Sequence, residues 1–230
     1  MCWDCLENEK VMKCKRTQTT IQIKLLGDLE KGGKMRGARD ADVQLAFRFW
    51  REFFLAAKPR VMSLMAQEAP ALIFSDGACE GVHFEEVTAG AVLVLPSGVI
   101  KFFGLRIPAK VVKEWQCQGQ EQTIGQAEIA PALLARLTWT DDLQGRRVVQ
   151  FIDNDSARFA LVKGYSPSLA SSALLSETWL QDCRLGLFSW YDRVPTASNI
   201  GDGPSRLDYE EVIQLGGVWS DPVLPGSWCV

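Results

Sequence analysis

Four acidic residues stand where a folded sheet protein could bring carboxylates together: Asp76, Glu128, Asp153 and Asp202. Asp76 and Asp153 each end an apolar run, in "LIFSD" and "VVQFID", whereas Glu128 and Asp202 lie near the starts of predicted helices. Converging carboxylates repel one another, so a cluster of them requires a cation. Ligands that are all oxygen favour Mg²⁺ or Mn²⁺ over zinc. Two such ions would activate a water and stabilise the leaving oxygen of a phosphodiester, which is nuclease chemistry.

Each acid also has an ordinary structural role open to it. Asp76 before Gly77 could form a turn, Asp202 before Pro204 could cap a helix, and Glu128 could be a solvated residue of a first helical turn. The joint pattern of four acids favours the metal site over these separate roles.

The segment "FIDNDSAR", residues 151–158, holds two acids that differ in position. Asp153 directly ends the predicted strand and is the candidate metal ligand. Asp155 is placed to cap the following helix and to interact with its positive end. Asp153 is therefore assigned to metal binding and Asp155 to the start of the helix.

The elements that would position these acids follow from the hydrophobic periods. Strands are predicted at residues 71–75, 88–95 and 99–107, with the turn "PSG" between the last two. A helix is predicted in "TIGQAEIAPALLARLTW", with Thr123 and Gln126 in capping-box spacing and Pro131 either near its first turn or at a kink.

The second half of the chain alternates strands and helices. Strands are predicted at 147–152 and 187–194, and helices at 156–163 and about 169–185, ended by Gly164 and Gly186. A last short helix opens in "GDGPSR". This order predicts an α/β fold with a five-stranded mixed sheet flanked by helices.

Four regions are expected along the chain. Residues 1–40 form a weakly ordered basic leader, residues 41–69 a helical connection whose helix spans 41–57, residues 70–210 the main domain, and residues 211–230 a loose tail. Residues 1–60 carry 13 Lys and Arg against 8 Asp and Glu, while residues 61–230 carry 12 against 20. The leader is either a phosphate-binding arm or a solvated segment.

Composition excludes some classes of protein. No apolar run is long enough to span a membrane, and the first residues lack the layout of a secretory signal. The seven scattered cysteines favour reduced thiols, so an intracellular protein of the cytoplasm or nucleus is expected. Cys2, Cys5 and Cys14 lack a suitably spaced fourth ligand for zinc.

Four blocks of the sequence around these acids resemble those of a known family. The blocks "IFSDGA", "QAEIAP", "VVQFIDND" and "RVPTASNIGDGPSR" resemble those of the ribonuclease H fold, in the form carried by retroelement reverse transcriptases, over about residues 70–207. The resemblance implies that Asp76, Glu128, Asp153 and Asp202 are the catalytic residues and ligands of two Mg²⁺ or Mn²⁺ ions. It also implies cleavage of the RNA strand of an RNA–DNA hybrid.

Details of the four blocks separate the chain from related enzymes. Transposases and integrases of this fold end their metal set with a glutamate, and proofreading exonucleases carry a glutamate where this chain has Ala78. The single histidine, His83, is not in the loop before the last aspartate, where many family members have one, so product release would be organised differently. The sequence contains no "YxDD" polymerase motif, and the 41–57 helix would be a remnant of the preceding connection.

Substrate contacts are predicted in the segment "NDSARFALVKGYSPS". Asn154, Ser156, Arg158 and Lys163 are candidates for binding nucleic acid, whereas Trp179 and Trp190 are assigned to the core rather than to base stacking. Two other functions stay open: a catalytically inactive module that binds nucleic acid or protein, and a DNA-directed nuclease. The acidic main domain favours the inactive module.

Overall fold

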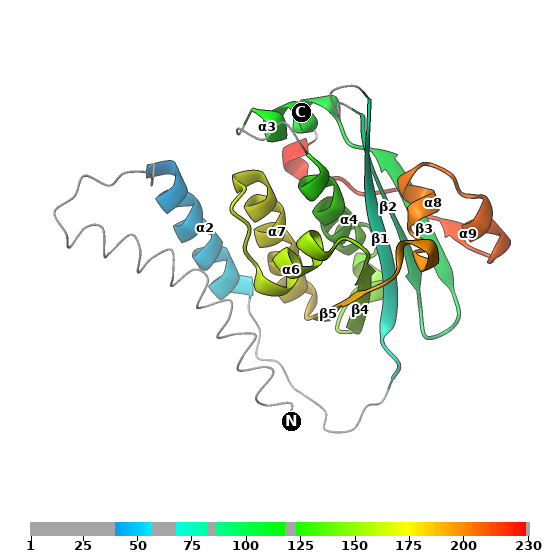
Figure 1. The fold of residues 1–230 in the computed structure, drawn as a ribbon. Coiled ribbons are helices and arrows are strands. Elements are labelled where there is room, and N and C mark those ends of the chain that lie inside the picture. The colour runs from blue at the N-terminus through cyan, green and yellow to red at the C-terminus, as the bar shows by residue number, and fades with distance from the viewer. Residues whose placement is uncertain (1–39, 57–67, 82–85, 118–122, 229–230) are drawn as a thin grey trace.

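The protein is built around one mixed sheet of six strands. The structure, a computed structural model, describes residues 40–56, 68–81, 86–117 and 123–228, with side chains from residue 47 onward. The strand order is β5-β4-β1-β2-β3-β6 (Figure 1). The strands are β1 (Ala71–Glu80), β2 (Glu86–Val94), β3 (Ile100–Arg106), β4 (Arg147–Ile152), β5 (Phe188–Arg193) and β6 (Val218–Trp219). β1, β2 and β3 form an antiparallel meander, β4 and β5 run parallel to β1, and β6 runs parallel to β3.

Helices cover both faces of this sheet. Figure 1 shows α4, α6 and α7 on one side and α8 and α9 on the other, and α2 packs against α7. The helices are α2 (Asp40–Ala56), α3 (Ala109–Gln116), α4 (Ile124–Thr138), α5 (Thr140–Leu143), α6 (Asp155–Lys163), α7 (Leu169–Leu185), α8 (Asp202–Ser205) and α9 (Glu210–Gln214), with two 3-10 turns at Thr196–Ser198 and Gly226–Trp228. Among the described residues no helix is both long and apolar enough to cross a membrane.

The predicted strands and helices are present, but β1 continues to Glu80, whereas the sequence predicts its end at residue 75. Alternate residues of β4 are buried, as the period of two requires. α6 and α7 end at Gly164 and Gly186, which adopt φ values of 64° and 65°. Only glycine takes this left-handed conformation without steric cost, so both helices end where the sequence predicts.

A buried polar network joins the helical layer to the sheet. The Arg136 side chain is fully buried and donates to Asp182, Gln150, Ser189 and Tyr191. Gln150 in turn donates to Ser75 Oγ at 2.7 Å. A buried guanidinium is tolerated only when its donors are satisfied in this way. The network therefore fixes α4, α7, β4 and β5 relative to one another. It reaches Ser75, the residue before Asp76.

The prediction of a loose tail is wrong for the described part of it. Val218 and Trp219 form β6 beside β3, Ser220 Oγ accepts from Trp139 Nε1 at 3.0 Å, and Trp228 packs edge-on against Trp115. A two-residue strand has no hydrophobic period that could be detected. The sheet consequently has six strands where five were predicted.

The predicted capping box at the start of α4 is also wrong. Thr123 makes no capping hydrogen bond and instead lies 3.7 Å from Cys79 Sγ, while Gln126 Nε2 donates to Ser168. Of the two alternatives for Pro131, a place near the first turn is excluded, because Pro131 lies in the middle of the helix.

The leader, residues 1–40, falls outside the described part of the chain except for its last residue. α2 confirms a helix in the 41–57 segment, and the division of the chain into four regions stays a prediction.

Candidate active site

Three of the four predicted acids converge, although only Asp153 directly follows the end of its element, β4; Asp76 lies inside β1 and not at its end as predicted. Phe74 of β1 pairs with Phe151 of β4, so Asp76 and Asp153 lie side by side two residues further along. Glu128 approaches from the second turn of α4. One carboxylate oxygen from each of Asp76, Glu128 and Asp153 lies within 4.8 Å of the others, and we call these three residues the acid cluster.

A glycine makes this approach of α4 possible. A Cβ atom on Gly77 would lie 2.1 Å from the carbonyl oxygen of Ala127 and 2.8 Å from the backbone nitrogen of Glu128. Only the absence of a side chain lets the helix backbone rest on β1 here. Pro131 has no N–H to offer the Ala127 carbonyl, which is the carbonyl that faces this glycine.

Burial and mutual repulsion weaken the acidity of the cluster. Burial, the largest cause, raises the pKa of Asp76 from 3.8 to about 6, with further increases from Asp153 and Asp202 and an opposing effect of the Ser205 hydrogen bond. Burial likewise raises the pKa of Glu128 from 4.5 to about 9, with Asp76 and Asp153 adding to the increase. Without a cation, Glu128 therefore keeps at neutral pH a proton that a free glutamate would lose.

The chemistry of the cluster fits a divalent cation. Glu128 Oε2 is buried and has no hydrogen-bond partner among the described residues. An unsatisfied buried carboxylate oxygen is costly, and a hard cation with oxygen ligands would satisfy it. Asp76, Glu128 and Asp153 are thus suited to hold Mg²⁺ or Mn²⁺.

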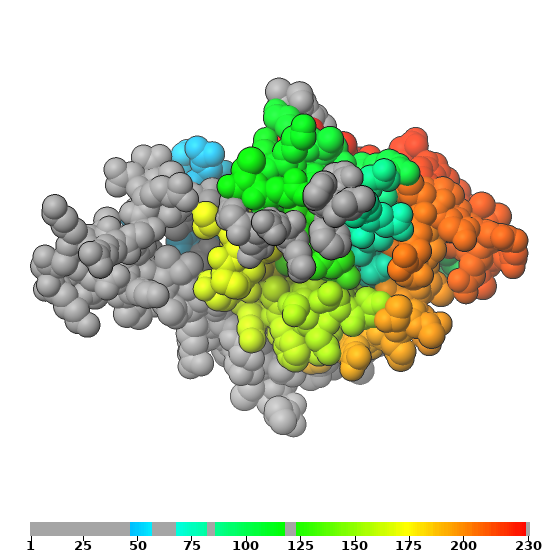
Figure 2. Space-filling model, turned by 45° about the horizontal axis from the view of Figure 1, so that its top comes forward, coloured from blue at the N-terminus to red at the C-terminus, as the bar shows by residue number. Residues whose placement is uncertain are grey.

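Asp202, the fourth predicted acid, lies at the rim of the same pocket. A pocket of about 240 Å³ is lined by all four acids together with Arg206. Asp202 is not part of the acid cluster, and its Oδ1 accepts from Arg206 Nε at 3.1 Å. Figure 2 shows this surface, where the teal end of β1, the yellow-green α6 and the orange α8 adjoin.

The structure separates the two acids of "FIDNDSAR" and corrects the predicted cap. Asp153 belongs to the acid cluster, whereas Asp155 is exposed and bonds Arg158 through its Oδ1 at 2.9 Å. The cap of α6 is Asn154, whose Oδ1 accepts from the Ala157 amide at 3.1 Å. Asp155 is the first helical residue, so it still lies near the positive end of α6.

The residues predicted to bind nucleic acid point in different directions. Asn154 faces the acid cluster, with its Nδ2 3.4 Å from Glu128 Oε1. Ser156 is exposed on the first turn of α6. Arg158 and Lys163 flank the ring of Phe159, at 4.5 and 5.6 Å from its centroid. These two cations and the exposed ring form a surface on α6 that we call the α6 cationic patch.

The two tryptophans assigned to the core differ in exposure. Trp179 is half-buried, consistent with the core, but Trp190 is 54% exposed on the edge strand β5, so its assignment to the core is wrong. His83 and the N-terminal cysteines lie outside the described residues.

Sequence reasoning missed two residues beside Asp202. Ser205 Oγ donates to Asp76 Oδ2 at 2.7 Å, and Arg206 binds Asp202. The spacing of three and four residues from Asp202 in a predicted helix was the available signal.

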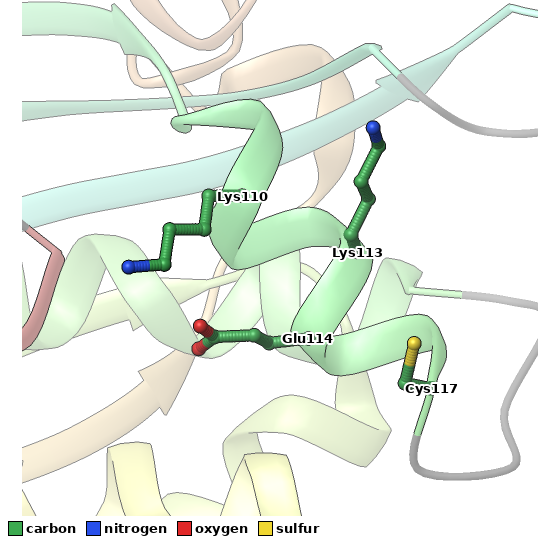
Figure 3. Close-up of a pocket in the computed structure, with 4 residues that line it drawn as sticks. All are labelled: Lys110, Lys113, Glu114 and Cys117. Carbon is green, nitrogen blue, oxygen red and sulfur yellow. The ribbon is translucent and has the colours of Figure 1, made fainter. Parts of the chain in front are cut away.

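A larger hollow of about 660 Å³ lies on α3 and shares no lining residue with the acid pocket. Its lining residues are Lys110, Lys113, Glu114 and Cys117. Figure 3 shows Lys113 projecting away from Lys110 and Glu114, so the charged groups do not converge on one point. The acid pocket is therefore the candidate active site in spite of its smaller volume.

The sequence matches no family model and no curated protein. Among solved structures, it is similar to ribonuclease H1 from the halophilic archaeon Halobacterium salinarum, with 16% identity and a TM-score of 0.43 over 62% of this chain and 99% of that one. It is also similar to LC9-RNase H1, a type 1 ribonuclease H with the type 2 active-site motif, with 16% identity and a TM-score of 0.46 over 70% of this chain and 81% of that one.

A foamy viral protease–reverse transcriptase, solved in complex with an RNA/DNA hybrid, is similar at 10% identity and a TM-score of 0.41, over 66% of this chain and 22% of that one. The expected α/β fold, with a mixed sheet flanked by helices, is confirmed by the strand order and by the helices on both faces. Identities this low say nothing of activity, so the case for a function depends on the site itself.

Proposed function

We propose that the protein is a metal-dependent endonuclease of the ribonuclease H type, which cleaves the RNA strand of an RNA–DNA hybrid. The observation that carries the proposal is the acid cluster, in which ligand oxygens of Asp76, Glu128 and Asp153 lie within 4.8 Å of one another. The buried Glu128 Oε2 without a partner among the described residues supports a cation at this place.

The catalytic roles follow from where the carboxylates lie. Asp76, Glu128 and Asp153 would hold one Mg²⁺ or Mn²⁺ ion, and Asp202 at the pocket rim would contribute to a second. When bound, the two ions supply activation of a water and charge stabilisation at the scissile phosphate. The chain's own residues keep the carboxylates in place, since Asn154 donates to Glu128 and Ser205 donates to Asp76.

Substrate binding is proposed along α6. Ser156, Arg158 and Lys163 would contact the phosphates of one strand, with Phe159 between the two cations. Asn154, in contrast, donates to Glu128, so any contact of Asn154 with substrate would lie beside the acid cluster. Preference for a hybrid would come from contacts to RNA 2′-hydroxyls across a wide, shallow minor groove.

Origin from a retroelement reverse transcriptase is part of the proposal. It is supported by the four sequence blocks in the order of that family and by α2, which precedes the sheet as a helix of a connection segment would. An intracellular location, in the cytoplasm or nucleus, completes it, since nucleic-acid substrates occur there.

The test is cleavage of an end-labelled RNA–DNA hybrid with Mg²⁺, with Mn²⁺ and with a chelator. We expect the RNA strand to be cut only with metal, and Asp153→Asn to abolish the cutting. Asp141→Asn is the matched control, because Asp141 is exposed on α5 and does not line the acid pocket. Cutting that persists in Asp153→Asn, or in the presence of chelator, would overturn the proposal.

One observation favours a second candidate, a catalytically inactive module that binds nucleic acid or protein. Residues 61–230 carry 20 acidic against 12 basic residues, and this net negative charge repels phosphate unless metal ions offset it. Binding of the hybrid without any cleavage by folded protein would support this candidate. Cleavage of duplex DNA in preference to the hybrid would instead indicate a DNA-directed nuclease on the same fold.

A further inference from the structure

Ser205 provides a buried hydroxyl directly behind the acid cluster. Its Oγ donates to Asp76 Oδ2 at 2.7 Å and also lies 2.8 Å from the backbone carbonyl of Asp202. Ser205 is 0% exposed and Asp76 is 5% exposed. A hydroxyl has one hydrogen to donate, and an ionised carboxylate is the stronger of the two acceptors. The bond to Asp76 is therefore favoured whenever Asp76 is charged.

We propose that Ser205 is a positioning residue of the acid cluster. Through its hydrogen bond it holds the Asp76 carboxylate in one rotation, facing Glu128 and Asp153, and so raises the affinity of the cluster for a divalent cation. This inference rests on the proposed function, because it assigns a support to the same metal site. Ser205 itself touches neither metal nor substrate.

Two glycines make the contact between Ser205 and Asp76 possible. Asp76 pairs with Gly90 across β1 and β2, and Gly90 pairs with Gly104 across β2 and β3, so the three residues form one row across the sheet. A Cβ on Gly90 would lie 2.2 Å from the backbone nitrogen of Ser205, and a Cβ on Gly104 would lie 2.4 Å from the carbonyl oxygen of Pro204. We call this pair of glycines the glycine seat.

The glycine seat brings the backbone of α8 into direct contact with the sheet. Any side chain at either position would lift α8 and with it the Ser205 hydroxyl. Pro204 and Ser205 are both buried on this seat. The glycine seat lies in the same row as Asp76. α8 therefore packs on the sheet at the place where the Ser205 hydroxyl contacts the Asp76 carboxylate.

A purely structural role for Ser205 is the alternative. Serine hydroxyls often bond the carbonyl three residues earlier in a helix, and the Asp202 carbonyl is in that position. Such a bond would stabilise α8 but would have no effect on cation affinity. The two roles are therefore separated by measuring metal binding in protein that is still folded.

The experiment is calorimetric titration of Mn²⁺ into the full chain, first freed of metal. Second-layer partners of metal ligands typically contribute 10- to 100-fold in affinity, so we expect Ser205→Ala to weaken Mn²⁺ binding about tenfold. Ser205→Cys keeps the volume but offers only a weak donor, and it should give an intermediate affinity. Thr178→Ala is the control, because Thr178 is also fully buried and bonds a helix carbonyl, that of Leu174 at 2.8 Å, without lining the acid pocket.

The possible outcomes distinguish failure of this inference from failure of the proposed function. An Mn²⁺ affinity in Ser205→Ala equal to that of the unaltered protein overturns the inference and leaves the proposed function standing. An equal loss of affinity in Thr178→Ala also overturns it, since the effect would then be a general one of lost hydroxyls. Unaltered protein that binds no Mn²⁺ overturns the proposed function and the inference together. If Ser205→Ala does not fold, Ser205→Cys decides in the same way.

Discussion

Asn154 links the acid cluster to the helix that follows it. Its Nδ2 lies 3.4 Å from Glu128 Oε1, while its Oδ1 accepts from the Ala157 amide at 3.1 Å and caps α6. One side chain thus satisfies a helix end and donates to a cluster carboxylate. The orientation of Glu128 is consequently coupled to the start of α6, which carries the α6 cationic patch.

Two substitutions of Asn154 should separate its two contacts. Asn154→Ala removes both, and the loss of the cap should lower the free energy of unfolding by about 1 kcal/mol. Asn154→Ser keeps a capping oxygen but is too short to reach Glu128, so it should cost less stability while weakening Mn²⁺ binding as much as the alanine does. Urea denaturation and Mn²⁺ titration measure the two effects. Full Mn²⁺ affinity in Asn154→Ser would show that Asn154 serves only the helix.

Gly77 sets the distance between β1 and α4, and its substitution should be costly. In Gly77→Ala the new methyl group would meet the Ala127 carbonyl, which is backbone and cannot rotate away. We expect a loss of about 1–3 kcal/mol in the free energy of unfolding, as for other overpacked sites. Gly125→Ala is the matched control, since a Cβ on Gly125 meets nothing within 4 Å. Gly125 is the second residue of α4, where alanine fits the helical backbone, so that variant should be at least as stable as the unaltered protein. A similar result for Gly77→Ala would contradict the close approach.

The parts of the fold that depend on local signals could be predicted from the sequence. The bounds of β4 and the ends of α6 and α7 follow from a period of two and from glycines at left-handed positions. The meeting of Asp76 with Asp153 also follows once the two strands are taken as parallel neighbours, although β1 continues past Asp76 to Glu80.

Other features depend on contacts between distant segments. β6 is two residues long and exists only because Val218 and Trp219 pair with β3. The role of Ser205 depends on Gly90 and Gly104, which lie about a hundred residues earlier and show no pattern that points to α8. Whether Asn154 or Asp155 caps α6 depends on where the helix begins, and a shift of one residue changes the answer. Helix propensity cannot decide between them, since both side chains accept hydrogen bonds.

Glu128 should make the stability of the metal-free protein depend on pH. Its pKa rises from 4.5 to about 9 in the folded chain, so the folded protein keeps a proton that the unfolded chain loses. The contribution of Glu128 to stability is therefore complete below pH 4.5 and is lost as the pH rises toward about 9. Within that window the loss approaches roughly 1.4 kcal/mol per pH unit for one proton.

Glu128→Gln should remove this dependence, because a glutamine stays neutral at every pH. In chelator at about pH 8 we therefore expect Glu128→Gln to be more stable than the unaltered protein, by urea denaturation. Added Mg²⁺ should stabilise the unaltered protein and have little effect on Glu128→Gln, since binding to the folded state alone raises stability. A parallel pH profile for the two proteins would show that Glu128 is charged in the folded, metal-free state.

The α6 cationic patch should control hybrid binding without taking part in the chemical step. Arg158 and Lys163 lie beside Phe159 and outside the acid pocket, so their joint replacement by alanine should raise KM and leave kcat nearly unchanged. Each lost phosphate contact should reduce the slope of log affinity against log salt by about 1, giving a reduction of about 2 for the double variant. Arg184→Ala on α7 is the control, because Arg184 pairs with Glu177 and Glu52 away from the pocket. An unchanged salt slope in the double variant would mean that the substrate path does not cross α6.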